Sequence, residues 1–236
     1  MKKCHWYHCF FLFFALLSLS FASCTLASYV TIHHDNTATV TLKITWQKPL
    51  EKYWGDLQEL DTSLPREPLD AVAVQSALEE VAAQPKSLLH NPQVISGTRT
   101  LQLSFQLDIS SPQAHLWGIE LNSTAQGHIL TMNWNHKALL QWLGTTSYSH
   151  SDALASFLPD SKTTSQELQK NFAYAIGSYS AHPDTLISNS TIQLVIKLPN
   201  PVQQLQGDAA YKGNLVTCKW PLTDFLTRNQ TVVIKY

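Results

Sequence analysis

The most regular pattern of the chain is TLQLSFQLDI, residues 100–109, where an apolar side chain occupies every second position. Successive side chains of a β-strand point to opposite faces of a sheet, so this period of two predicts a strand with one buried and one wet face. A helix would not collect these apolar residues on one side, because its period is 3.6. A sheet is therefore the framework of the fold.

The same alternation recurs on both sides of this stretch. Residues 29–46 alternate around a polar turn at Asp35-Asn36, which predicts an opening antiparallel hairpin. A second hairpin is predicted from two apolar segments, 116–121 and 129–134, that flank a polar run. Three closing strands are predicted at 192–198, 215–220 and 232–236.

Helical spacing appears between these strands. Residues 71–83 place Val74, Leu78 and Val81 on one face, and residues 165–176 repeat this pattern before Gly177. Shorter helices are predicted at 135–143 and 154–158, and a loop-rich region at 49–68. Strands and helices in blocks predict an α+β fold, with a mostly antiparallel sheet of about seven strands and three or four packed helices.

The first 23 residues have the composition of a secretory signal peptide. A basic start, Met1-Lys2-Lys3, precedes an apolar run from Phe10 to Leu19 that is too short to cross a bilayer comfortably. We therefore expect residues 1–23 to be removed, leaving residues 24–236 as a single extracytoplasmic domain.

Cys24 is the candidate lipidation site. Small residues, Ala22 and Ser23, precede it as in a bacterial lipobox, although Phe21 stands where leucine is usual. We expect cleavage before Cys24 and a diacylglyceryl group on its thiol. Acyl chains such as palmitate would then hold the protein to a membrane of the cell envelope, at the periplasmic face or the cell surface. Cleavage by the general signal peptidase, giving a secreted soluble protein, and an uncleaved anchor remain alternatives.

The charge of the chain limits the kinds of partner it can bind, and its cysteines limit the disulfides it can form. Charged residues make up 14% of the chain, and loss of Lys2 and Lys3 moves the net charge from −1 to about −3. A nucleic-acid partner needs a basic stripe, so none is expected. Cys218 lies in an alternating segment and is expected to be a small buried strand residue; a disulfide with an unmodified Cys24 is the alternative.

The two ends of the mature chain resemble bacterial LppM-type lipoproteins. The resemblance is carried by the leader ending in cysteine, by the first hairpin at 38–44, and by the closing block at 194–199 and 212–222. It implies an envelope-facing α+β domain, associated with glycolipid binding and host contact in some members, with no established catalysis. Mycobacterial members carry a C-terminal membrane helix, and no such segment is found in this sequence.

Catalytic and metal signatures do not emerge from the sequence. His33, His34 and Asp35 are consecutive, but neighbours on a strand point to opposite faces and would not share a metal without a sharp turn. The chain has no Gly-x-Ser-x-Gly elbow, phosphate-binding loop or dinucleotide fingerprint. No metal, cofactor or catalytic residue is predicted, and the protein is not expected to be an enzyme.

Tryptophans are the candidate ligand-binding residues. The chain has seven, and large amphipathic rings can stack on sugars or line an acyl pocket. Trp54, expected in an exposed loop, Trp117 and Trp134 are the candidates; filling of the core is the alternative for each. The sequence favours a non-catalytic module that binds lipid, glycolipid or another envelope component. A structural or host-contact protein without a small ligand is the second hypothesis, and an uncharacterised envelope enzyme the third.

Overall fold

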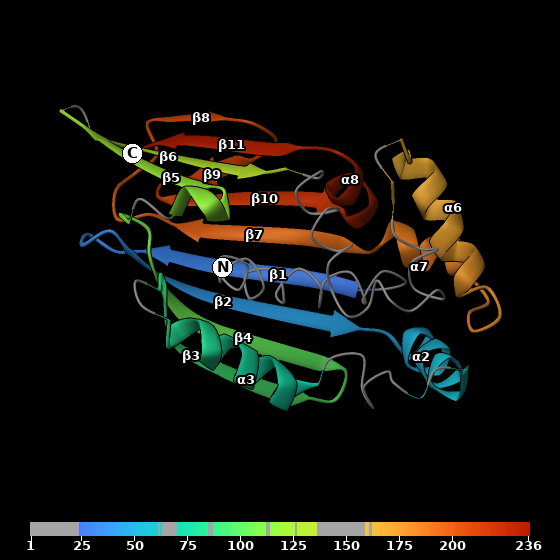
Figure 1. The fold of residues 1–236 in the computed structure, drawn as a ribbon. Helices are drawn as coiled ribbons and strands as arrows, with labels where there is room; N and C mark the ends of the chain where they lie inside the picture. Colours follow the sequence, from blue (N-terminus) through green and yellow to red (C-terminus); the bar gives the residue numbers. More distant parts are fainter. Residues whose placement is uncertain are drawn as a thin grey trace.

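A computed structural model describes residues 24–60, 62, 70–84, 87–111, 114–125, 127–135, 159–160 and 162–236. The larger of its two sheets has seven strands in the order β3-β4-β2-β1-β7-β10-β9 (Figure 1). All neighbouring strands are antiparallel except β1 and β7, which are parallel. The strands are β1 (Cys24–Ile32), β2 (Thr37–Trp46), β3 (Leu89–Gly97), β4 (Thr100–Asp108), β7 (Thr191–Lys197), β9 (Ala210–Lys212) and β10 (Leu215–Pro221).

A second sheet has four strands in the order β5-β6-β11-β8, all antiparallel. These are β5 (Ile119–Thr124), β6 (Gly127–Trp134), β8 (Gln204–Gln206) and β11 (Gln230–Lys235). The α+β class and the mostly antiparallel pairing agree with the sequence prediction. The described part contains eleven strands, which are divided between two sheets. The sequence did not indicate short strands such as β8 and β9, because they have too few residues to show alternation.

The helices lie on one face and at one end of the larger sheet. Helix α3 (Ala71–Ala82) packs on β3, and α2 (Lys48–Leu60), α6 (Ser165–Ala175) and α7 (Pro183–Ser188) lie at one end (Figure 1). The 3₁₀ helix η1 (Ala114–Trp117) precedes β5, and α8 (Leu222–Thr227) follows β10. The long helices predicted at 71–83 and 165–176 are confirmed, whereas those predicted at 135–143 and 154–158 lie outside the described residues.

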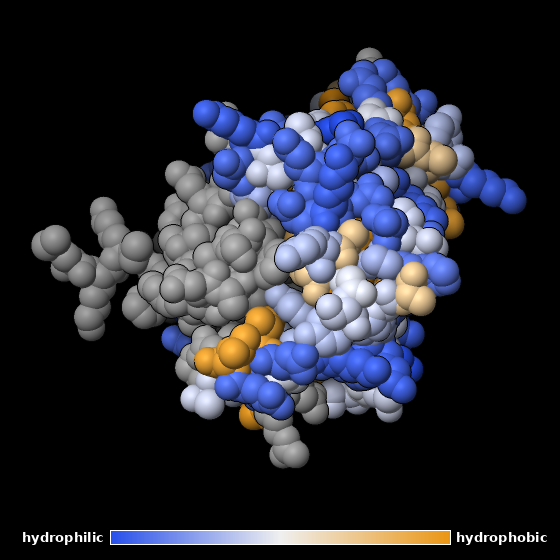
Figure 2. Space-filling view, turned by 90° about the vertical axis from the view of Figure 1, so that its right-hand side faces the viewer, coloured by the Kyte–Doolittle hydropathy of each residue, from blue (hydrophilic) through white to orange (hydrophobic). Residues whose placement is uncertain are grey.

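The prediction of a loop at 49–68 was wrong for its first part, which forms α2. Pro49 lies in the first turn of this helix, where a proline costs nothing because its missing N–H would have no partner. Leu50, Trp54 and Leu57 fall on one helical face and are buried. Figure 2 looks at the end of the molecule that carries α2 and α6, where hydrophobic residues appear in small separate groups among hydrophilic ones.

The core lies between the two sheets and beneath α3. The pattern seen at residues 100–109 is realised in β4, whose Leu101, Leu103, Phe105 and Leu107 are all buried. Cys218 is a fully buried free thiol, as expected for a small strand residue. Among the described residues, no helix combines the length and the apolar character needed to span a membrane.

Candidate functional site

An apolar cavity of about 120 Å³ lies between the two sheets and opens partly to the surface. Its floor is formed by residues of the larger sheet that point inward. Its other walls come from α3, the first residue of β3, the residue after β4, and the second sheet. The floor residues are Ser28, Val30, Ile32, Ala38, Val40, Leu42, Phe105, Leu107 and Leu194, and the walls add Leu78, Leu89, Ile109, Ile119, Leu130, Met132 and Trp134.

Strand register explains why the floor is hollow. Ala38 on β2 pairs with Ile32 on β1 and with Leu107 on β4, so a single methyl group lies between two large side chains. Ser28 pairs with Leu42 and is small as well. Two small residues on the inward face leave space that larger apolar residues would fill.

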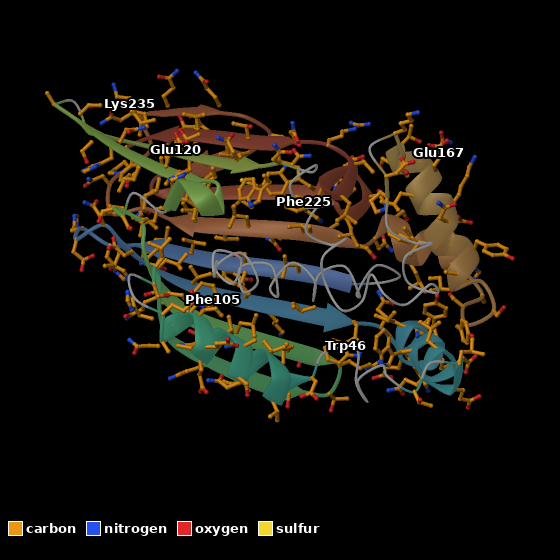
Figure 3. The ribbon with its side chains drawn as sticks, in the orientation of Figure 1. Trp46, Phe105, Glu120, Glu167, Phe225 and Lys235 are labelled. Atoms are coloured by element: carbon orange, nitrogen blue, oxygen red, sulfur yellow. The ribbon has the colours of Figure 1, made fainter. Side chains whose placement is uncertain are left out.

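The opposite wall follows from the same alternation in β6. Leu130, Met132 and Trp134 occupy every second position of this strand and face the cavity. Ile119 on β5 pairs with Met132, which extends the wall by one strand. Figure 3 shows Phe105 on β4, in the part of the sheet beside α3, where Leu78 contributes the side wall.

Size and polarity restrict what the cavity can hold. A cavity of ~150 Å³ holds benzene, with its six carbon atoms, so this cavity has room for about five carbon atoms. Pockets for drug-sized ligands reach ~300–1,000 Å³, so this one suits a segment of a narrow chain. Ser28 offers the one hydroxyl group among the described lining residues, and apolar cavities of this kind stay dry.

An aromatic cluster adjoins the cavity at Trp134. Its ring centroid lies 5.3 Å from that of Trp220 and 6.2 Å from that of Phe225. Trp220 and Phe225 are themselves 5.8 Å apart. The buried indole Nε1 of Trp220 has no hydrogen-bond partner in the described part of the chain, at a cost of ~1–3 kcal/mol. A carbonyl oxygen reaching this group would remove that cost.

The structure separates the three predicted tryptophans. Trp134 is half-buried and lines the cavity. Trp54 was expected to be exposed, but it is 2% exposed on α2, because residues 48–60 form a helix that buries this face. The side chain of Trp117 lies outside what the structure describes. Ligand binding by these rings stays a prediction.

Cys24 is the first residue of β1, and its backbone pairs with Trp46. The leader, residues 1–23, lies outside the described part, so its removal and the lipidation of Cys24 stay predictions. Cys218 is not in a disulfide, and burial raises the pKa of its thiol to about 12, with a smaller contribution from the charge of Asp208.

The other groups singled out in the sequence lie on the surface. His33 and His34 are exposed in the turn between β1 and β2, and a ring nitrogen of His33 is 2.9 Å from the hydroxyl of Thr39. In the same turn, hydrogen bonds from Thr37 lower the pKa of Asp35. The described residues contain no group of three or more histidine, cysteine or acidic side chains placed to hold a metal ion.

Comparison with solved structures finds proteins of similar fold. No family model and no curated protein matches the chain. The fold is similar to that of the folded domain of the Mycobacterium tuberculosis LppM protein, solved by NMR. The TM-score is 0.42 and the identity 10%, over 91% of this chain and 90% of that one. LppM is the type of protein that the two ends of the sequence resemble, and a likeness of this size carries no statement about ligand or activity.

Sequence reasoning missed most of the cavity residues. Alternation predicts that Phe105 and Met132 point inward, but it does not indicate that space remains between them. Ala38 and Ser28 carry a signal, since each is a small residue at an inward position of a strand whose other inward residues are mostly large.

Proposed function

We propose that this protein is a lipoprotein of the cell envelope whose domain binds one acyl chain of a lipid or glycolipid, without catalysing a reaction. The observation that carries the proposal is the cavity between the sheets, whose lining is apolar apart from Ser28 and the indole nitrogen of Trp134. Burying an acyl chain there would gain ~0.8 kcal/mol for each methylene group. With room for about five carbon atoms, the cavity accepts the end of a chain, and the rest of the lipid lies outside.

Membrane attachment through Cys24 is part of the proposal. The described part of β1 begins at Cys24, so cleavage before this residue leaves all the described strands in place. β1 is the central strand of the larger sheet, and a lipid on its first residue would tether one end of this strand. Attachment at this point favours a location in the envelope.

Ligand binding is tested with a linear fluorescent fatty acid, cis-parinaric acid, added to the delipidated protein. Val40→Phe introduces a ring at the cavity floor, and Thr41→Phe makes the same change on the opposite face of β2 as a matched control. The wild type and the control should bind the probe, and Val40→Phe should not. Equal binding by all three proteins, or no binding by the wild type, contradicts the proposal.

Lipidation is tested separately by growing cells with a clickable fatty acid. The wild type should be labelled and Cys24→Ala should not. Cys218→Ala is the matched control, because Cys218 is fully buried and should not affect labelling. Labelling of Cys24→Ala, or absence of label on the wild type, excludes the anchor and leaves acyl-chain binding to be judged by the fluorescent probe.

A further inference from the structure

No described helix or strand covers the face of the larger sheet that points away from the core. Register assigns one set of residues of β1, β2, β4, β7 and β10 to the cavity side and the alternate set to this outer face. Every residue of the alternate set is half-buried or exposed, including Thr41 and Val195 in the middle of the sheet. The described helices and the second sheet therefore leave this face open.

Charge on the outer face is almost entirely positive. Register places four exposed lysines there: Lys43, Lys197, Lys212 and Lys219. Asp108 is the one acid at an outward position of the described strands of this sheet, and its carboxylate accepts hydrogen bonds from the backbone N–H and the hydroxyl of Ser110. A protein with a net charge of −1 thus concentrates lysines on one face, with Asp35 of the turn after β1 in the same surface hollow as Lys197.

The lysines surround an exposed apolar residue. Leu215 on β10 pairs with Lys197 on one side and Lys212 on the other, and Lys219 follows four residues later on the same face of β10. Leu215 is 40% exposed, and Tyr29, on the same face, is 50% exposed. Ile95 on β3 adds a third exposed apolar side chain to this face.

We propose that this outer face, defined by Lys43, Lys197, Lys212 and Lys219 with Tyr29 and Leu215, docks onto the surface of an anionic lipid bilayer. Lysines next to an anionic membrane attract its headgroups, and aromatic and aliphatic side chains enter the headgroup region. The strands present all of these groups on one face of the sheet, which can be turned toward a membrane surface.

The position of Cys24 supports this occupant. Cys24 is the first residue of β1, at one end of the central strand of the sheet. Register places Cys24, opposite Trp46, in the inward set, and the next residue, Thr25, on the outer face. An anchor there keeps the face within reach of the bilayer, so that docking becomes an intramolecular step. This argument rests on the lipid anchor of the proposed function, whereas the charge argument does not.

The test is lysine acetylation of the full-length protein on vesicles, with the rate at each lysine measured by mass spectrometry. Vesicles of phosphatidylcholine are compared with vesicles that also contain phosphatidylglycerol. On the anionic vesicles, acetylation of the four face lysines should slow, while Lys52 on α2 and Lys170 on α6, both exposed, should react as before. High salt should remove the protection.

A double substitution measures how much the lysines contribute to docking. Each lysine near an anionic surface contributes about a fivefold factor, so Lys197→Gln with Lys219→Gln should lower the ratio of docked to undocked protein about 25-fold. The control, Lys52→Gln with Lys170→Gln, should leave this ratio unchanged.

Three results would overturn the inference: equal acetylation on both kinds of vesicle, protection of Lys52 and Lys170 instead of the face lysines, or an equal effect of the two double substitutions. If the protein does not sediment with phosphatidylcholine vesicles in a centrifugation control, the lipid anchor is missing. Slower acetylation of the face lysines on anionic vesicles would still support the docking face in that case.

Discussion

Filling the cavity from its floor should stabilise the protein, and the sign of the change tests whether the space exists. Ala38→Leu adds three carbon atoms between Ile32 and Leu107. At ~0.8 kcal/mol for each buried methylene group, the three carbon atoms raise the unfolding free energy by about 2.4 kcal/mol. The loss of rotamer freedom of the leucine lowers it by about 0.5–1 kcal/mol. We expect a net stabilisation of ~1.5–2 kcal/mol.

The assay is urea unfolding of the delipidated protein, followed by tryptophan fluorescence. Thr41→Leu, on the opposite face of β2, controls for the change in side chain without entering the cavity. A densely filled core would instead be strained by the extra atoms, at a cost of ~1–3 kcal/mol. Destabilisation of Ala38→Leu, with an unchanged dependence on urea and a neutral control, would refute the cavity.

The same variant should separate stability from binding. A ligand at 100 times its dissociation constant raises the unfolding free energy of the wild type by about 2.7 kcal/mol. Ala38→Leu occupies the ligand's space, so added fatty acid should no longer stabilise it. Equal stabilisation of both proteins by fatty acid would place the ligand elsewhere.

Three further predictions concern stability and reactivity. Cys218, whose pKa is raised to about 12 by burial, should resist thiol reagents in the folded protein and react in urea; rapid labelling of the native protein would contradict its placement. Thr164→Ala should cost about 1 kcal/mol, because Thr164 and Glu167 form the capping box of α6. Hydrogen bonds from the backbone and side chain of Thr164 lower the pKa of Glu167 below 4.5, the value in the unfolded chain. The stabilisation by ionised Glu167 is therefore present above pH 4.5 and is lost as the pH falls through the lowered pKa. Urea unfolding at a series of pH values should show that acid reduces the unfolding free energy less in the variant than in the wild type. Gly118→Ala should destabilise the protein, because a Cβ would lie 2.0 Å from the carbonyl oxygen of Asn133 and the φ of this residue is +70°. Gly55→Ala in α2 places a Cβ with no atom within 4 Å and should stabilise the protein by up to ~1 kcal/mol. Thermal unfolding that ranks the two variants in the opposite order would contradict the backbone geometry.

The sheet could be predicted because its strands are buried on one face only. β2, β4 and β7 each alternate between buried and exposed residues, so the sequence carries the pattern directly. Helix α2 could not be recognised from Pro49 and Gly55, which suggest a loop, although Leu50, Trp54 and Leu57 have helical spacing. The error over Trp54 follows from that misread helix.

The candidate site could be predicted only in part. Trp134 was identified from its residue type, and it does line the cavity. The space itself depends on residues that are far apart in the sequence, such as Ala38 on β2, Leu78 on α3 and Met132 on β6. Alternation indicates which face a residue occupies, but the volume left between two sheets depends on how they pack.

The most direct test of acyl-chain binding uses the methyl group of Met132. Met1 and Met132 are the only methionines of the chain, and Met1 belongs to the leader, so ¹³C-methyl labelling provides one reporter inside the mature domain. On addition of palmitic acid, we expect the Met132 methyl resonance to shift and to show nuclear Overhauser effects to the acyl methylene protons, because this residue lines the cavity. A resonance that stays unchanged when palmitic acid is present at saturation would contradict the proposed function.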